Sequence, residues 1–147
     1  MNKIISMLLL ACAPIAAFAA SPPQEKAFVD AYKKAFEAKD EKALTGFLYT
    51  KGADPQALAF YKMMMTSDMG GKVTSIQLAN LDDSDKKRAQ GGPGPNGKPM
   101  KFTLTPTKKL VIKTETKDAN GSSSSTSEVF VAESDGKLVI PAPGAAN

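Results

Sequence analysis

The segment Leu110–Ile140, LVIKTETKDANGSSSSTSEVFVAESDGKLVI, carries the clearest structural signals in this 147-residue chain. It contains two dipeptides, Asn120-Gly121 and Asp135-Gly136, that favour tight hairpin turns because they accept the positive φ angles such turns need. The stretches between them are rich in β-branched residues. The segment therefore predicts an antiparallel meander, with strands over 110–116, 122–132 and 138–140.

Two further strands are expected upstream of the meander. Val73–Leu81 is rich in β-formers, and Thr74, Ile76 and Leu78 fall on one side of it. Met100, Phe102 and Leu104 also alternate with polar residues. Pro106 then interrupts the pattern, which predicts a bulge or an edge position because proline cannot donate to a sheet.

The segments 82–99 and 141–147 are predicted to be irregular. Residues 82–99 contain aspartates, then Lys86-Lys87-Arg88, then a run of glycine and proline, which predicts a solvated, mobile loop with a charge cluster at Asp82–Asp85. The string Gly92–Lys98 has the letter spacing of a phosphate-binding loop, but two of its residues are prolines without an N–H to offer. Residues 141–147 are expected to be a frayed tail.

Helices are predicted before residue 73. Ser21, two prolines and Gln24 form a helix start with a capping box. Asp40 and Asp54 are the expected N-caps of a second and a third helix, the latter rich in methionine. The first helix is two-faced, and its apolar stripe comprises Ala27, Phe28, Ala31, Tyr32, Ala35 and Phe36. Helices followed by a meander indicate the α+β class, with N-terminal helices packed on a curved antiparallel sheet.

The first residues indicate export. Met1-Asn2-Lys3 is a positive start, Ile4–Ala16 is almost wholly apolar, and Ala17-Phe18-Ala19 fits a signal-peptidase site. We expect residues 1–19 to be removed as a signal peptide, leaving a single domain over 20–147 in the periplasm or secreted, with no membrane span. The alternative is a lipoprotein anchored at Cys12, because Leu9-Leu10-Ala11-Cys12 resembles a lipoprotein box.

Composition narrows the chemistry of the domain. Cys12 is the only cysteine and the chain has no histidine, so residues 20–147 lack a disulfide, a thiol nucleophile and the commonest metal ligand and base. The net charge of +4 is spread out, and Arg88 is the only arginine, which argues against a nucleic-acid partner. The sequence therefore predicts no metal, no cofactor and no catalytic residue.

The segment Ala31–Asp40, AYKKAFEAKD, and the closing Asp135–Ile140, DGKLVI, resemble the first helix and last hairpin of the nuclear transport factor 2-like superfamily, of cystatin-like α+β fold. The resemblance implies an exported bacterial branch whose sheet curls round the helices and leaves an apolar pocket. In the ketosteroid isomerase-like branch, a tyrosine matching Tyr32 works with an aspartate base. That base would fall near Gln56, and the neighbouring Asp54 is better explained as a helix cap.

These observations favour a non-catalytic binding domain. We expect it to hold a small apolar or amphipathic ligand, or a partner segment, in the concavity of its sheet. The alternatives are a cell-envelope interaction protein that self-associates, as a homodimer for example, and an isomerase-like enzyme. The expected pocket walls, which could equally form a closed core, are Phe28, Tyr32, Phe36, Phe60, Met64, Ile76, Leu110, Ile112 and Val129.

Overall fold

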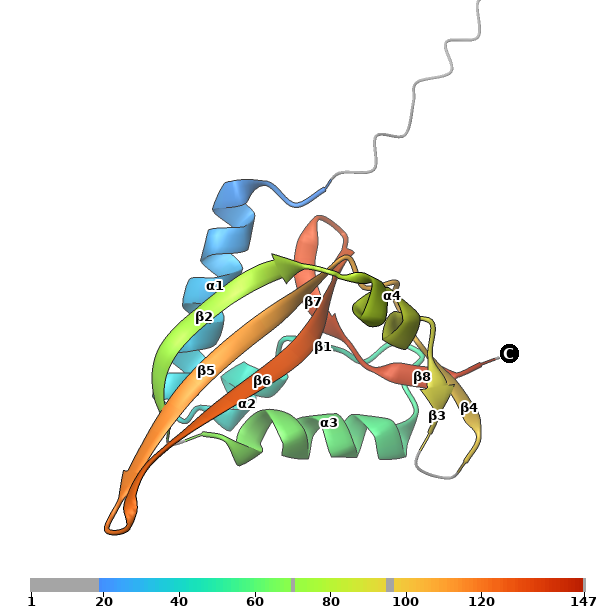
Figure 1. The fold of residues 1–147 in the computed structure, drawn as a ribbon. Coiled ribbons are helices and arrows are strands. Elements are labelled where there is room, and N and C mark those ends of the chain that lie inside the picture. The colour runs from blue at the N-terminus through green and yellow to red at the C-terminus, as the bar shows by residue number, and fades with distance from the viewer. Residues whose placement is uncertain (1–18, 70, 95–96, 147) are drawn as a thin grey trace, which may run out of the picture.

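The computed structural model describes residues 19–69, 71–94 and 97–146 (Figure 1). The predicted export signal and lipoprotein box therefore lie outside the described residues, except for Ala19. No helix within the described ranges is both long and apolar enough to span a bilayer.

Three helices begin where the sequence predicts. Helix α1, Pro22–Glu37, starts with the expected capping box, in which the Gln24 side chain accepts from the Ser21 backbone N–H at 2.8 Å. Helix α2, Glu41–Thr45, is capped by Asp40. Helix α3, Pro55–Ser67, is capped by Asp54, whose carboxylate accepts two backbone N–H groups. On α1, Ala27 and Ala31 are exposed and the rest of the predicted stripe is buried.

The main sheet has the order β1-β7-β6-β5-β2. Its strands are β1 (Leu48–Tyr49), β2 (Lys72–Asn80), β5 (Lys108–Asp118), β6 (Gly121–Ser134) and β7 (Lys137–Pro141). Pairing is antiparallel except between β1 and β7, which run parallel. The α+β prediction is confirmed, with one parallel strand added at the sheet edge.

The two turns of the meander are present. Asp135 and Gly136 have φ angles of 51° and 72° and join β6 to β7, as the Asp-Gly signal predicts. The other turn lies one residue earlier than predicted, because Asp118 already pairs with Gly121. A bulge in β2 between Val73 and Ser75 turns Val73 inward and leaves Thr74 exposed, so the prediction that Thr74 lies on one side with Ile76 and Leu78 is wrong.

A second sheet contradicts two predictions. Its strands are β3 (Gly92–Pro93), β4 (Pro99–Phe102) and β8 (Pro143–Ala145), in the order β3-β4-β8. Residues 82–99 are thus not a plain loop, because they include helix α4, Asp83–Ala89, as well as β3. Residues 143–145 are not a frayed tail, because they pair with β4. Pro106 is buried in the link between the two sheets.

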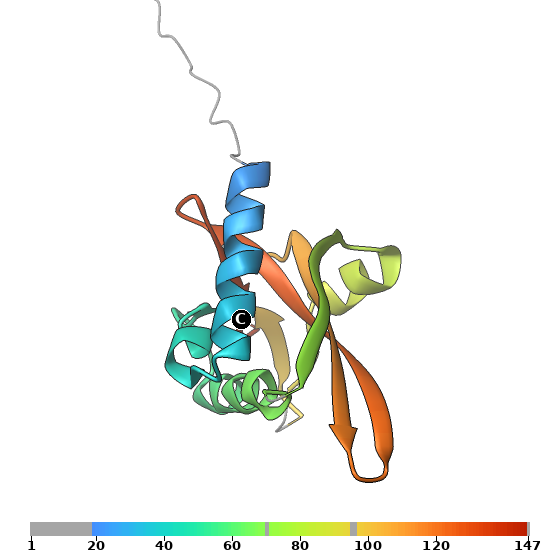
Figure 2. The same ribbon diagram turned by 90° about the vertical axis from the view of Figure 1, so that its left-hand side faces the viewer.

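The core lies between α1 and the main sheet. Figures 1 and 2 show α1 along one face of that sheet. The tip of the hairpin of β5 and β6 projects beyond the other elements. Phe28, Tyr32 and Phe36 of α1 are buried in one cluster with Leu110, Ile112, Val129 and Val131 of the sheet. Their burial removes large apolar surfaces from water, which stabilises the packing of helix on sheet.

Candidate ligand-binding groove

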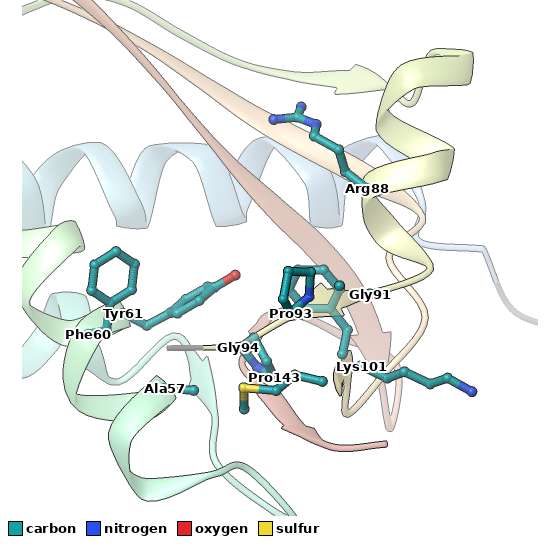
Figure 3. A pocket seen from close by; sticks show the side chains of 12 residues that line it. Ala57, Phe60, Tyr61, Arg88, Gly91, Pro93, Gly94, Lys101 and Pro143 are labelled. Carbon is teal, nitrogen blue, oxygen red and sulfur yellow. The ribbon is translucent and has the colours of Figure 1, made fainter. Parts of the chain in front are cut away.

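A groove of about 470 Å³ opens between α3, α4 and the small sheet (Figure 3). Helix α3 contributes Ala57, Phe60 and Tyr61, and α4 contributes Arg88. The small sheet and its approach contribute Gly91, Gly92, Pro93, Gly94, Met100, Lys101, Phe102 and Pro143. A volume of this order is typical of sites for small organic ligands.

Aromatic rings run along the groove in edge-to-face contact. The centroids of Phe60 and Tyr61 are 6.4 Å apart, and those of Tyr61 and Phe102 are 6.5 Å apart. Phe102 in turn meets Phe130 of β6 at 5.3 Å and 90°. Since such pairs hold each other's orientation, the groove has a preformed aromatic wall. Phe60, which lines the groove, is 50% exposed.

The polar groups of the groove differ in whether they point into it and whether they already have partners. In Figure 3 the Tyr61 hydroxyl points into the space between α3 and Pro93, while the Lys101 amine points away from it. The Arg88 guanidinium bonds to Asp85 and Glu128 and lies 5.3 Å from the Phe130 ring centre. Burial raises the pKa of Tyr61 to about 12, so its hydroxyl is neutral at ordinary pH and can donate or accept a hydrogen bond.

Two glycines allow the wall opposite α3 to approach β4. Gly91 has a φ of +101°, and a methyl group there would overlap the Met100 carbonyl oxygen. At Gly94 it would overlap the Met100 side chain. Gly91 and Gly94 therefore permit a close approach to Met100, whereas Gly92 and Gly97, which give the string its phosphate-loop spacing, face open space.

A cluster of charges fixes α4 beside the groove. Asp85 is 1% exposed, and its carboxylate lies 2.8 Å from the Lys109 amine and also bonds to Arg88. Glu128 of β6 completes the cluster, 3.0 Å from Lys109 and 3.2 Å from Arg88. The Lys109 ammonium and the Arg88 guanidinium hold the pKa of Asp85 well below its usual range. The prediction of a solvated charge cluster is thus wrong for Asp85.

In the part of the chain that the structure describes, side chains fill most of the sheet concavity in which the pocket is expected. Six of its predicted walls are buried in the core, namely Phe28, Tyr32, Phe36, Leu110, Ile112 and Val129, and Ile76 packs against them. A cavity of only about 60 Å³ remains there, beside Tyr32 and Met64. Phe60 lies in the groove, away from this core. The groove was missed because Arg88, Gly91–Gly94 and Pro143 belong to segments predicted to be irregular.

Tyr32 faces the small core cavity. Asp68 and Ser127 also line it, and the Ser127 hydroxyl donates to the Asp68 carboxylate at 3.1 Å. Burial, reinforced by the Asp68 charge, raises the pKa of Tyr32. Asp54 is a helix cap, and Gln56, where the resemblance would place a base, is exposed. Tyr32 therefore shares a cavity with Asp68, and neither Asp54 nor Gln56 lines that cavity.

A second hollow lies near the groove and has a more polar lining. This hollow, of about 680 Å³, lies across Phe102 from the groove, and its walls include Lys86, Gln90, Lys101 and Thr105. Among the described residues, no three acidic, cysteine or histidine side chains are grouped so that they could hold a metal ion.

Comparisons with protein-family models, with curated proteins and with solved structures found no match.

Proposed function

We propose that this protein is an exported, non-catalytic binding domain that holds a small apolar ligand in the groove between α3 and the small sheet. The observation that carries the proposal is the Phe60 ring, half exposed on an aromatic wall beside a space of about 470 Å³. An apolar ligand in this space would cover exposed surface of the ring, and removing apolar surface from water is favourable. The export part of the proposal rests on the apolar segment before Ala20.

The chemistry of the lining defines the ligand. Successive rings of Phe60, Tyr61 and Phe102 are tilted by 71° and 79°, so an aromatic ligand could stack on the face of one ring and meet the edge of the next. Because the neutral Tyr61 hydroxyl is directed into the space and can donate or accept, the ligand should carry one group that pairs with it, such as a carbonyl oxygen. The cations offer no strong anion site, since Arg88 is paired with two carboxylates and Lys101 points outward.

A titration with prodan, an uncharged naphthalene ketone that fluoresces more strongly in apolar surroundings, tests the proposal. We expect saturable binding, weakened about tenfold by Phe60→Ala, a loss of about 1.4 kcal/mol. Tyr61→Phe keeps the ring and removes the donor, so affinity should fall about threefold, as for one neutral hydrogen bond.

Met63→Ala is the matched control, because Met63 is also an exposed apolar residue of α3, at 61%, but faces the α2 side. It should leave prodan affinity unchanged. Absence of saturable binding, or equal losses for Phe60→Ala and Met63→Ala, contradicts the proposal.

A further inference from the structure

The outer edge of β6 is an open strand edge. On one side, β6 pairs with β5 from Gly121 to Val131. On the other side, β7 pairs only with residues 132–134, and in the described part of the chain no strand pairs with residues 121–131 on that side. Residues 121–126 of this edge are exposed, so their outward backbone N–H and C=O groups are available to a further strand, whereas Ser127 is half-buried and bonds to Asp68.

The two long edges of this part of the sheet differ. The edge formed by β2 begins at Lys72 and is broken by the bulge between Val73 and Ser75, both of which hinder the addition of a strand. The β6 edge from Gly121 to Ser127, GSSSSTS, contains no charge, no proline and no bulge. Residues 121–126 are all exposed. One edge is thus protected against pairing and the other is not.

The same segment suits a second copy of itself. An antiparallel pair centred on Ser124 places Gly121 opposite Ser127 and Ser122 opposite Thr126, and no like charges meet. Cross-strand serine and threonine pairs are favourable. The nearest charge along the strand, Glu128, already bonds to Lys109 and Arg88 and falls outside the paired segment.

We infer that two copies of this chain associate through the β6 edges of residues 121–127, related by a two-fold axis at Ser124. The sheet then continues through both copies, as β5-β6 of one molecule beside β6-β5 of the other. Such an interface is isologous and closes at two copies, because each molecule offers one open β6 edge to it. The hairpin that projects in Figure 2 is the part of the molecule that makes this contact.

Cysteine cross-linking tests the axis in the full chain carrying Cys12→Ala, which has no other cysteine. Opposed residues of an antiparallel pair lie about 4.5–5.5 Å apart at Cα, within the range a disulfide accepts. Ser124→Cys should therefore form a disulfide-linked dimer under mild oxidation. Thr116→Cys, also exposed but on the β5 strand of the same hairpin, should stay largely monomeric.

A second measurement does not depend on cysteine. Light scattering across a broad concentration range should show the wild-type mass rising to twice that of the monomer. Ser124→Lys, which places two like charges at the axis, should keep the protein monomeric, whereas Thr116→Lys should dimerise as the wild type does. A monomer at every concentration, equal cross-linking at positions 116 and 124, or open-ended oligomers overturns the inference.

Discussion

The backbone nitrogen of Ala20 lies 2.9 Å from Oε1 of Glu133, and both residues are partly buried. If cleavage follows Ala19, this nitrogen becomes a charged amino group beside a carboxylate. We predict that Glu133→Gln lowers the free energy of unfolding by about 1 kcal/mol in a chain that starts at Ala20. In the uncleaved chain, where the nitrogen is an amide, the loss should be smaller.

Urea unfolding of both chain forms measures the difference. Glu41→Gln, an exposed position at the start of α2, is the control and should have little effect in either form. Equal losses from Glu133→Gln in the two forms would show that the new charge adds nothing.

Acid stability should depend on Asp85. Its pKa is lowered in the folded state by Lys109 and then Arg88, so its stabilising effect is present above the usual aspartate pKa of about 3.9 and is lost as the pH falls below it. Asp85→Asn should lower stability at neutral pH and flatten the decline on the acid side. Thermal unfolding from pH 7 downward checks this, with the exposed Asp83→Asn retaining the wild-type acid decline.

The interior against α1 should behave as a closed core. Leu110 is fully buried, so Leu110→Ala should lower the free energy of unfolding by about 2–5 kcal/mol through lost burial and an unfilled cavity. Met63→Ala should change it by no more than about 0.5 kcal/mol, because Met63 is exposed. Denaturant titrations measure both values. A mild effect at Leu110 would indicate an adaptable, open concavity instead.

The close approach of the chain to β4 depends on Gly91. Gly91→Ala should destabilise the protein by about 1–3 kcal/mol, because alanine is strained at a φ of +101° and its methyl group overlaps the Met100 carbonyl oxygen. Gly92→Ala is the matched control, since the space around that position is open. Its unfolding midpoint should stay close to that of the wild type. Similar losses at both positions would contradict the strain argument.

The elements predicted correctly carry local signals. Ser21 and Gln24 cap α1, Asp54-Pro55 starts α3, and Asp135-Gly136 forms a turn, because each depends on residues close in sequence. Helix α4 also has a local signal, a reciprocal cap. The Asp85 backbone N–H donates to the Asp82 carboxylate at 2.8 Å, and the Asp82 backbone N–H donates to the Asp85 carboxylate at 3.1 Å. Hydrophobic periodicity does not indicate this helix, because it is short and highly charged and has no apolar stripe.

The groove could not be predicted, because long-range contacts build it. The sequence of β8, Pro-Gly-Ala, has no local preference for a strand, and the segment forms one only because it pairs with β4. Helix α3 is apolar on several faces, so periodicity could not show that Phe60 and Met63 stay exposed while Ala57 and Met65 are buried. Burial of Asp85 likewise depends on Lys109 and Glu128, which lie on distant strands.

The parallel pairing of Leu48 with Ile140 cannot form until nearly the whole chain has been synthesised. A chain that crosses a membrane with its N-terminus leading would deliver α1, α2 and β1 well before their partners on β7. Contacts between such distant segments form slowly. Until the strands of the main sheet follow, the aromatic face of α1 would have no partner to cover it.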